Sequence, residues 1–346
     1  MSGPVVGFVG LGNMGGALAA NLVKAGFEVL AYDAAGPART PLGARWAPGP
    51  AYLARAVDVV VLSLPDGDVC EQVIRDLKAV RERRVTHVVD TSTVGVSAAR
   101  RLAAMGLGYV DAPVSGGAAG ARRRTLMVMY AGSEADCARV EPVLAGLSDR
   151  RRRVGDRPGQ AQALKLANNF LSATALAATS EAVAFGTSAG LDPAVLLEVL
   201  NASSGRSAAT ADKFPDEVLT GRYASGFSNT LMAKDVRLYL REVAELGGAT
   251  VLAEVTQAVW GAFATAQPGA DFTRIYPFTT GTSQPADTSQ PADTSETADA
   301  SGAVGTPGTV GTPETVGTPG TVGTSGTTGA SESPSSTESA SRTTSG

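Results

Sequence analysis

The sequence predicts an α/β fold in which a doubly wound, mostly parallel sheet is followed by an all-helical domain and a disordered tail. Strand-like and helix-like segments alternate over residues 1–158, and helical periodicity without a strand signal fills residues 159–278. Residues 279–346 are rich in Ser, Thr, Gly and Pro and lack aromatic residues, so they cannot repay the entropy of ordering. We therefore expect these three ranges to be separate domains.

Charge and cysteine usage exclude several classes of protein. The net charge is −4, but seven acidic residues and one Arg lie from residue 279 onward, which leaves 28 basic and 26 acidic residues before it. This balance gives no global sign of nucleic-acid or membrane binding. Cys70 and Cys137 lack metal-ligand or CxxC spacing, which favours free thiols and no metal. Because neither a secretory leader nor a bilayer-spanning run is visible, we expect a cytoplasmic protein.

The first thirty residues predict strand, helix, strand. A Val/Phe run covers residues 4–9, helical periodicity covers 13–25, and a second apolar run covers 27–32. The turn between the first strand and the helix consists of Gly10, Leu11, Gly12, Asn13, Met14 and Gly15. Glycines in such a turn allow a tight bend and a close approach of pyrophosphate to the helix N-terminus. The pattern therefore predicts a Rossmann-type dinucleotide site.

Asp33 follows the second strand, 18 residues beyond Gly15. A carboxylate in this position would accept hydrogen bonds from the adenosine ribose hydroxyls and would repel a 2′-phosphate, which favours NAD. Arg39 nearby leaves NADP possible. The alternative reading of Asp33 is a residue that only caps a turn.

Three more apolar runs, over residues 57–64, 85–90 and 109–114, continue the alternation. In a doubly wound sheet, ligands bind at the carboxyl ends of the strands. After the last of these strands, Ser115, Gly116 and Gly117 would bare successive backbone N–H groups, a nest that suits a carboxylate or phosphate. An ordinary glycine turn is the alternative.

A long, mostly buried helix is expected over residues 159–185, which are rich in Ala and Leu and contain no proline. Lys165 and Asn169 are spaced i and i+4 and project from one face. Burial among Leu, Ala and Phe would lower the Lys pKa toward neutrality and make it a candidate proton donor and acceptor. A Lys that reaches solvent beside a helix-interior Asn is the competing interpretation.

Helical patterns continue to about Phe278. Asp192 and Pro193 form an N-cap and first helical position, and further helices are expected over 231–246 and 251–266. Long apolar helices of this kind are commonly buried against another subunit, so we expect a homodimer or homotetramer.

Four motifs together resemble those of the β-hydroxyacid dehydrogenases, the relatives of 3-hydroxyisobutyrate dehydrogenase and tartronate semialdehyde reductase. The resemblance covers roughly residues 4–276. Its motifs are the glycine-rich turn, Asp-Ala-Pro-Val-Ser-Gly-Gly ending at Gly117, Lys-Leu-Ala-Asn-Asn from Lys165, and Phe227 with Leu-Met-Ala-Lys-Asp ending at Asp235.

The resemblance implies a role for each matching position. Lys165 would be the catalytic acid and base. The substrate would be held by Ser115, Gly116, Gly117, Asn169, Phe227 and Asp235. The cofactor would be lined by Leu64, Pro65, Thr93 and Lys234 in addition to the glycine-rich turn and Asp33.

Three departures from the family pattern stand out. Arg122–Arg124 occupy positions where relatives usually have small or acidic residues ending in glycine, and Ala161 replaces a usual glycine. Arg150–Arg153 form a further basic run. Either Arg cluster could draw an anionic substrate, whereas charge runs are usually solvated faces.

We expect an oxidoreductase that transfers a hydride between NAD and C3 of a small 3-hydroxy carboxylate, with Lys165 moving the proton. Asn168 and Ser172 replace the His and catalytic Glu of 6-phosphogluconate dehydrogenase, which argues against that reaction. The single His, His87, lies in a predicted strand and is poorly placed for catalysis. The alternatives are a non-catalytic dinucleotide-binding assembly module, or a reductase of a non-carboxylate substrate such as an imine, although imine reductases replace the Lys that is present here.

Overall fold

The computed structural model describes residues 5–281, and its strands form one sheet in that part of the chain. The strand order is β3-β2-β1-β4-β5-β6-β8-β7, with β9 paired to β8. The strands are β1 (Val5–Val9), β2 (Glu28–Tyr32), β3 (Arg45–Trp46), β4 (Val59–Leu62), β5 (His87–Asp90), β6 (Gly108–Asp111), β7 (Val114–Ser115), β8 (Met127–Ala131) and β9 (Arg150–Gly155). Strands β1 to β6 pair in parallel, and β8 runs antiparallel to β6 and β7.

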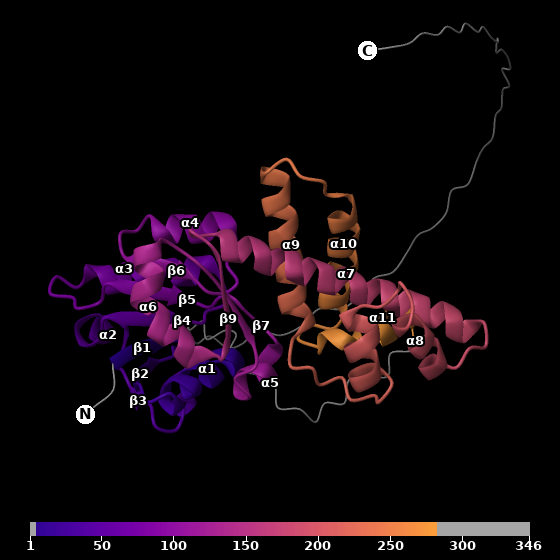
Figure 1. The fold of residues 1–346 in the computed structure, drawn as a ribbon, viewed down its shortest axis with the longest axis horizontal. Coiled ribbons are helices and arrows are strands. Elements are labelled where there is room, and N and C mark those ends of the chain that lie inside the picture. Colours follow the sequence, from indigo (N-terminus) through magenta and orange to yellow (C-terminus); the bar gives the residue numbers. More distant parts are fainter. Residues whose placement is uncertain (1–4, 282–346) are drawn as a thin grey trace, which may run out of the picture. The chain divides into compact units, whose positions relative to one another are not determined.

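Helices cover both faces of this sheet (Figure 1). They are α1 (Asn13–Lys24), α2 (Pro50–Ala56), α3 (Gly67–Ala79), α4 (Val96–Ala103), α5 (Gly117–Arg122) and α6 (Glu134–Leu147). The apolar faces of α1, α5 and α6 share one buried cluster with β1, whereas those of α2, α3 and α4 form a second cluster on the other face. Buried Asn21 of α1 donates to the Ala121 and Leu147 carbonyls, so it ties α1 to α5 and α6. The predicted doubly wound sheet is confirmed.

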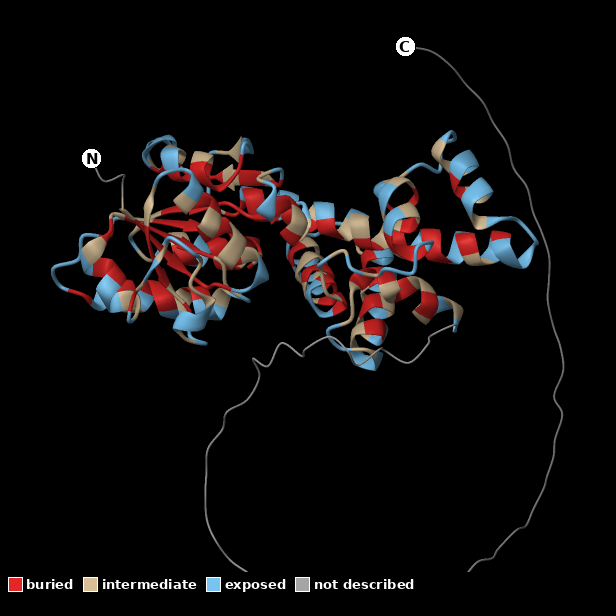
Figure 2. Ribbon diagram, turned by 90° about the horizontal axis from the view of Figure 1, so that it is seen from below, coloured by how far each residue is buried: buried red, intermediate tan, exposed pale blue. Residues whose placement is uncertain are grey.

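The rest of the described chain is helical. Its elements are α7 (Gln160–Ser188), α8 (Pro193–Asn201), a wide-turned π-helix (Ala209–Val218), α9 (Asn229–Glu245), α10 (Val251–Ala266), a short 3-10 turn (Phe272–Arg274) and α11 (Ile275–Thr280). Their core surrounds fully buried Trp260, which packs near Phe263 and Phe272. Figure 2 shows buried residues following the inward faces of these helices and the strands of the sheet. The Asp192 carboxylate accepts from the Ala194 and Val195 amides, as its N-cap pattern predicts.

The structure adds to the sequence expectations in three places. Strands β3, β8 and β9 had no sequence signal that we recognised, and the run over residues 109–114 is two short strands, β6 and β7, interrupted at Pro113. Helix α11 continues to Thr280, two residues beyond the expected end of the helical domain at residue 278. The remaining prediction for the tail, that it is disordered, lies outside the described residues.

Within residues 5–281, no helix combines the length and the apolar character needed to cross a membrane.

Candidate active site

The centre of the candidate site is a buried chain of polar groups between α7 and α9. Lys165 Nζ donates to Asn169 Oδ1 at 3.1 Å, and Asn169 Nδ2 donates to Asp235 Oδ2 at 2.6 Å. The i, i+4 spacing on α7 brings the first two together, as the sequence predicts. Asp235 comes from the second turn of α9, because the Ser228 hydroxyl caps that helix at the Leu231 amide and fixes where it begins.

Lys165 is 8% exposed, so it does not reach solvent as a surface Lys would. Burial lowers the pKa of its ammonium group from the usual 10.5, the Asp235 carboxylate opposes this shift, and the positive charge of Lys234 adds to it. The lowered pKa makes Lys165 a candidate proton donor and acceptor. The predicted buried environment of Lys165 is confirmed.

Lys234 connects this chain to the sheet. Its Nζ lies 3.3 Å from Asp235 Oδ1 and donates to the Pro65 and Thr93 carbonyls at 3.2 and 2.9 Å. Pro65 follows β4 and Thr93 follows β5, so one ammonium group holds two loops at the carboxyl ends of adjacent strands. Four residues predicted for the cofactor and the substrate therefore lie in one contact network.

Gln162 makes a second connection from α7 to the same edge of the sheet, and sequence reasoning missed it. Its side chain is fully buried; Nε2 donates to the Ser92 carbonyl at 2.9 Å and Oε1 accepts from the Val94 and Gly95 amides. Its backbone amide donates to Asp111 Oδ2 at 3.0 Å. Gln162 thus fixes the loop that carries Thr93. It lies one turn before Lys165 on α7. The only available signal was a polar residue on the buried face of α7.

The glycine-rich turn has the shape that a dinucleotide needs. A Cβ on Gly10 would lie 2.2 Å from the Ser63 carbonyl oxygen, so the turn packs directly on the end of β4, whereas Gly12 has no atom within 4 Å of such a position. The open side at Gly12 leaves space for pyrophosphate at the start of α1. Asn13 and Met14 form the first turn of that helix. The residues present therefore fit NAD or NADP.

Asp33 is buried beside this turn. Its carboxylate accepts from the Leu11 amide at 2.6 Å and from the Ala35 amide at 2.8 Å, and Arg39 Nη1 lies 3.9 Å from its Oδ1. The two backbone donors fix the orientation of the carboxylate. They leave further lone pairs for the ribose hydroxyls, since an ionised carboxyl group has about four acceptor sites.

The Ser115–Gly117 segment lies between β7 and α5. Gly116 and Gly117 have φ values of 131° and 66°, a backbone conformation that favours glycine. A Cβ on Gly117 would lie 3.5 Å from the carbonyl oxygen of Ser225, two residues before Phe227. The Phe227 ring makes an edge contact with Phe272 at 5.7 Å. No hydrogen bond in the described part of the chain joins the Ser115–Gly117 segment to Lys165 or Asn169; the Phe227 loop lies beside it instead.

Two buried carboxyl groups near the site were not predicted to matter. Asp90 and Asp111 are partners in the register of β5 and β6, and both are fully shielded from solvent. Burial raises both pKa values, that of Asp111 to about 7, although Asp90 accepts from the Tyr109 hydroxyl and the Ser92 amide. Asp90 thereby orders the loop after β5, and Asp111 holds the start of α7 through the Gln162 amide.

Three residues of the Arg clusters, Arg124, Arg151 and Arg153, make structural contacts. Arg124 adopts φ 60° and donates to the Asn21, Ala145 and Gly146 carbonyls and to Asp149, so it clamps α1 to α6. Arg151 pairs with Glu141, and Arg153 donates to the Gly132 carbonyl. His87 lies 3.3 Å from Asp136, away from Lys165 in the sheet. These contacts favour the interpretation of the Arg runs as surface and packing residues.

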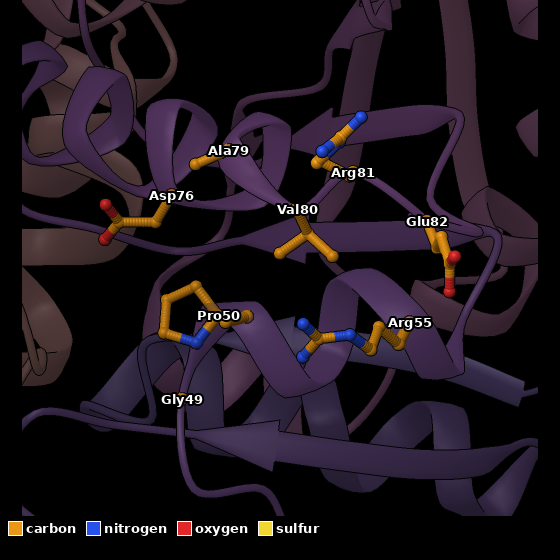
Figure 3. A pocket seen from close by; sticks show the side chains of 9 residues that line it. Gly49, Pro50, Arg55, Asp76, Ala79, Val80, Arg81 and Glu82 are labelled. Atoms are coloured by element: carbon orange, nitrogen blue, oxygen red, sulfur yellow. The ribbon is translucent and has the colours of Figure 1, made fainter.

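A hollow of about 900 Å³ lies between α2 and the end of α3 and contains none of the predicted site residues. Figure 3 shows Pro50 and Arg55 on one side of it and Asp76, Val80 and Glu82 on the other. Its charges are mixed, and no polar group there is deeply buried. This hollow therefore has no chemical feature that would rival the network around Lys165.

Comparisons with known proteins agree with this geometry. Residues 5–155 match the family model described as the NAD binding domain of 6-phosphogluconate dehydrogenase, and residues 159–279 match the one described as NAD-binding of NADP-dependent 3-hydroxyisobutyrate dehydrogenase. The chain is 36% identical over 244 residues to 2-(hydroxymethyl)glutarate dehydrogenase of Eubacterium barkeri, covering 68% of this chain and 81% of that protein. It is 35% identical over 294 residues to 3-hydroxyisobutyrate dehydrogenase of Pseudomonas aeruginosa, covering 80% and 98%.

A solved structure gives the same result. The structure of Mycobacterium tuberculosis 3-hydroxyisobutyrate dehydrogenase with L-serine superimposes with a TM-score of 0.73 and 30% identity, covering 80% of this chain and 99% of that one. Relatives at this identity and coverage share family and fold. The chain belongs to the 3-hydroxyisobutyrate dehydrogenase family of NAD(P)-dependent oxidoreductases, which act on a CH–OH group.

Proposed function

We propose that the protein oxidises the primary hydroxyl of a small 3-hydroxy carboxylate with NAD, and that Lys165 carries the proton. The observation that supports this most directly is the buried ammonium group of Lys165, with its lowered pKa, hydrogen-bonded to Asn169. The reverse reaction, reduction of the aldehyde, uses the same groups.

The names of the relatives indicate the class of substrate. 3-Hydroxyisobutyrate, 2-(hydroxymethyl)glutarate and the serine in the solved structure all carry a CH₂OH group on the carbon next to the carboxylate. They differ only in the third substituent on that carbon. We infer that this chain acts on a compound of the same form, HOCH₂–CH(R)–COO⁻.

Each group in the network then has a task. A bound nicotinamide would accept the hydride from the CH₂OH carbon. Neutral Lys165 would take the hydroxyl proton in the same step, and Asn169, held by Asp235, would keep Lys165 Nζ and the hydroxyl aligned. The backbone N–H groups of Ser115–Gly117 would bind the carboxylate, and Phe227 would exclude water from one side.

NAD is the cofactor that we propose, because the oriented Asp33 carboxylate would accept hydrogen bonds from the ribose hydroxyls and would repel a 2′-phosphate. Arg39 lies 3.9 Å from that carboxylate. It is the residue that would bind the 2′-phosphate if NADP were used instead of NAD. The family model for residues 159–279 names an NADP-dependent enzyme, so family membership alone does not predict NAD. We therefore attribute the proposed preference for NAD to Asp33.

Replacement of Lys165 tests the proposal. Lys165→Ala removes the proton acceptor and should lower kcat for oxidation of 3-hydroxyisobutyrate by ~10²- to 10⁴-fold, the usual contribution of a positioned acid or base. Lys165→Arg should be almost as slow, because a guanidinium group keeps its proton near neutrality. Asn169→Ala should mainly raise the KM, because Asn169 orients and does not react.

Affinity for NAD, measured by fluorescence titration, is the control for these three variants and should change little. Lys165→Ala with wild-type turnover would rule out this mechanism. Turnover of no 3-hydroxy acid by wild type, with intact NAD binding, would instead favour a non-catalytic dinucleotide-binding module. An imine as the preferred substrate would favour the remaining alternative.

We also propose that the chain assembles into a homodimer or homotetramer. Several apolar side chains of α7, α8 and α10 are more than half exposed, a pattern that indicates contact with another surface. They are Phe185, Val195, Val199, Val251, Leu252 and Val255.

A cytoplasmic location is the setting that we propose, since Cys70 and Cys137 are both free and buried. Free thiols are the usual state in a reducing compartment. Fractionation of cells that express the full chain tests this location, and recovery outside the cytoplasm would refute it.

A further inference from the structure

Lys213 lines a pocket of about 360 Å³, which lies on the same side of α7 as Lys165. One wall consists of Asn168, Leu171, Ser172, Ala175 and Leu176 from α7, and the other of Ser207, Ala208, Ala209 and Lys213. Ser172 follows Lys165 by two helical turns, so it lies on the same face about 10 Å further along the axis. Asn168 donates to Asn169 Oδ1, so one residue that lines the pocket contacts the Lys165–Asn169 pair.

Lys213 belongs to the π-helix Ala209–Val218, a rare form that is frequent at functional sites. Its Nζ lies over the Phe272 ring, 5.7 Å from the centroid, and Phe272 also contacts Phe227. The side chain is half-buried, so its charge is less screened than that of a fully exposed Lys.

The charge of Lys213 is not taken up by an ion pair within the described residues. On the same helix, burial raises the pKa of Glu217, but Arg222, with a smaller contribution from Lys213, holds it below its ordinary value. Glu217 is paired with Arg222 at 2.6 Å, so its charge is already balanced. Asp212 and Asp216 on the same helix are exposed.

We propose that this pocket takes the third substituent of the substrate and that Lys213 binds a second carboxylate at its end. The proposal rests on the proposed function. With the hydroxyl at Lys165 and the first carboxylate at Ser115–Gly117, the R group of HOCH₂–CH(R)–COO⁻ extends along α7 past Asn168. The preferred substrate is therefore a dicarboxylate, with Lys213 as a specificity-determining residue.

A matched pair of substrates tests the role of charge. 2-(Hydroxymethyl)glutarate carries a distal carboxylate, and its distal amide has nearly the same shape without the charge. Wild type should prefer the dicarboxylate in kcat/KM by about ten- to a hundredfold, the range for a hydrogen bond to a charged group. Lys213→Gln should remove most of this preference, chiefly through a higher KM, because the contact is remote from the reacting carbon.

Lys24→Gln is the matched control, since it removes an equal charge from an exposed position at the end of α1. It should leave the preference intact. Turnover of 3-hydroxyisobutyrate and of both glutarate derivatives with equal kcat/KM in wild type would overturn the role of Lys213 and leave the proposed function standing. Retention of the preference in Lys213→Gln would also overturn it.

A binding measurement separates this inference from catalysis. Calorimetric titration of the NAD-loaded full chain with glutarate and with glutaramate compares two and one carboxylates without a reacting hydroxyl. Glutarate should bind about tenfold more tightly to wild type, and the difference should disappear in Lys213→Gln. Equal binding of the two compounds to wild type would refute the second carboxylate site even if no substrate is turned over.

Discussion

At the scale of single residues, the most informative property of the molecule is the protonation state of Lys165. The side chain is buried and lies near a second ammonium group, and both effects favour its neutral form. The Asp235 carboxylate opposes both effects and favours the charged form. A lowered pKa makes it easier for the group to give up and take back a proton, which is the role that we propose for Lys165 in both directions of the reaction.

The pH dependence of turnover follows from this shift. Oxidation of the alcohol needs neutral Lys165, so kcat for oxidation should rise with pH and level off at a pH below the ordinary Lys pKa of 10.5. Reduction of the aldehyde needs the ammonium form, so its kcat should fall over the same interval. Profiles of kcat in both directions measure this. A midpoint at or above 10.5 would show that Lys165 is not the titrating group.

We propose that Asp33 sets the cofactor preference. Asp33→Asn removes the negative charge while it keeps an acceptor for the Leu11 amide at its present 2.6 Å contact. We expect NADP to improve relative to NAD by about ten- to a hundredfold in kcat/KM, because repulsion of the 2′-phosphate ends and Arg39 is released from its ion pair. Steady-state kinetics with both cofactors measure the ratio. A wild type that already works better with NADP would contradict the role of Asp33.

At the scale of elements, the connection between α7 and the loop after β5 joins the helix that carries Lys165 to the loop that carries Thr93. Gln162→Leu keeps the volume but leaves the buried Val94 and Gly95 amides without their acceptor, at a cost of ~1–3 kcal/mol for each unsatisfied group. We expect a melting temperature several degrees lower and a weaker affinity for NAD, because the loop carries Thr93.

The control for this change is Gln72→Leu, which alters an exposed residue of α3 and should have little effect on either property. The melting temperature comes from calorimetry and the affinity from fluorescence titration. Wild-type values of both in Gln162→Leu would mean that the loop after β5 holds its position without α7.

The helices and strands differ in how far the sequence predicts them. Helix α10 begins and ends where its periodicity indicates, and α8 starts at the predicted Asp192 cap, because caps and periodicity are local. Strand β9 is different: four consecutive Arg residues do not resemble a strand, and the segment is extended because it pairs with β8 in parallel. Sheet pairing of this kind is a non-local property that no single segment reveals.

The candidate site follows the same rule. The pairing of Lys165 with Asn169 was predictable from helical spacing, and so was the glycine-rich turn, which needs only a strand before it and a helix after it. The contact of Asn169 with Asp235 joins residues 66 positions apart, and that of Gln162 with Ser92 joins residues 70 apart. Such contacts depend on how α7 packs against α9 and the sheet, which the sequence pattern does not specify.

At the scale of the whole molecule, the segment beyond Gly281 can be separated from the chemistry. The network around Lys165 and the glycine-rich turn lie entirely within residues 5–281, and α11 closes the helical core with Ile275 and Pro277. Composition predicts that residues 282–346 add no core of their own. A chain stopped after Gly281 should therefore keep its melting temperature, its activity and its assembly state.

Calorimetry, steady-state kinetics and light scattering on the shortened and full chains measure these three properties. We expect both chains to have the mass of the same dimer or tetramer, since the exposed apolar side chains of α7, α8 and α10 are present in both. A loss of stability, or a change in the number of subunits, would show that the terminal segment packs against the rest. A monomeric mass for both would refute the proposed assembly.

Asp235 accepts from Asn169 and pairs with Lys234, so one carboxylate serves the Lys165–Asn169 pair and the loop-holding Lys at once. Evolution cannot adjust these two tasks independently. Loss of Asp235 would remove the carboxylate that favours the charged form of Lys165 and that pairs with Lys234, and a later change at either Lys would then have a different effect on activity. Residues 165, 169, 234 and 235 should therefore show epistasis, and a homologue that has lost one of them is expected to have replaced the others.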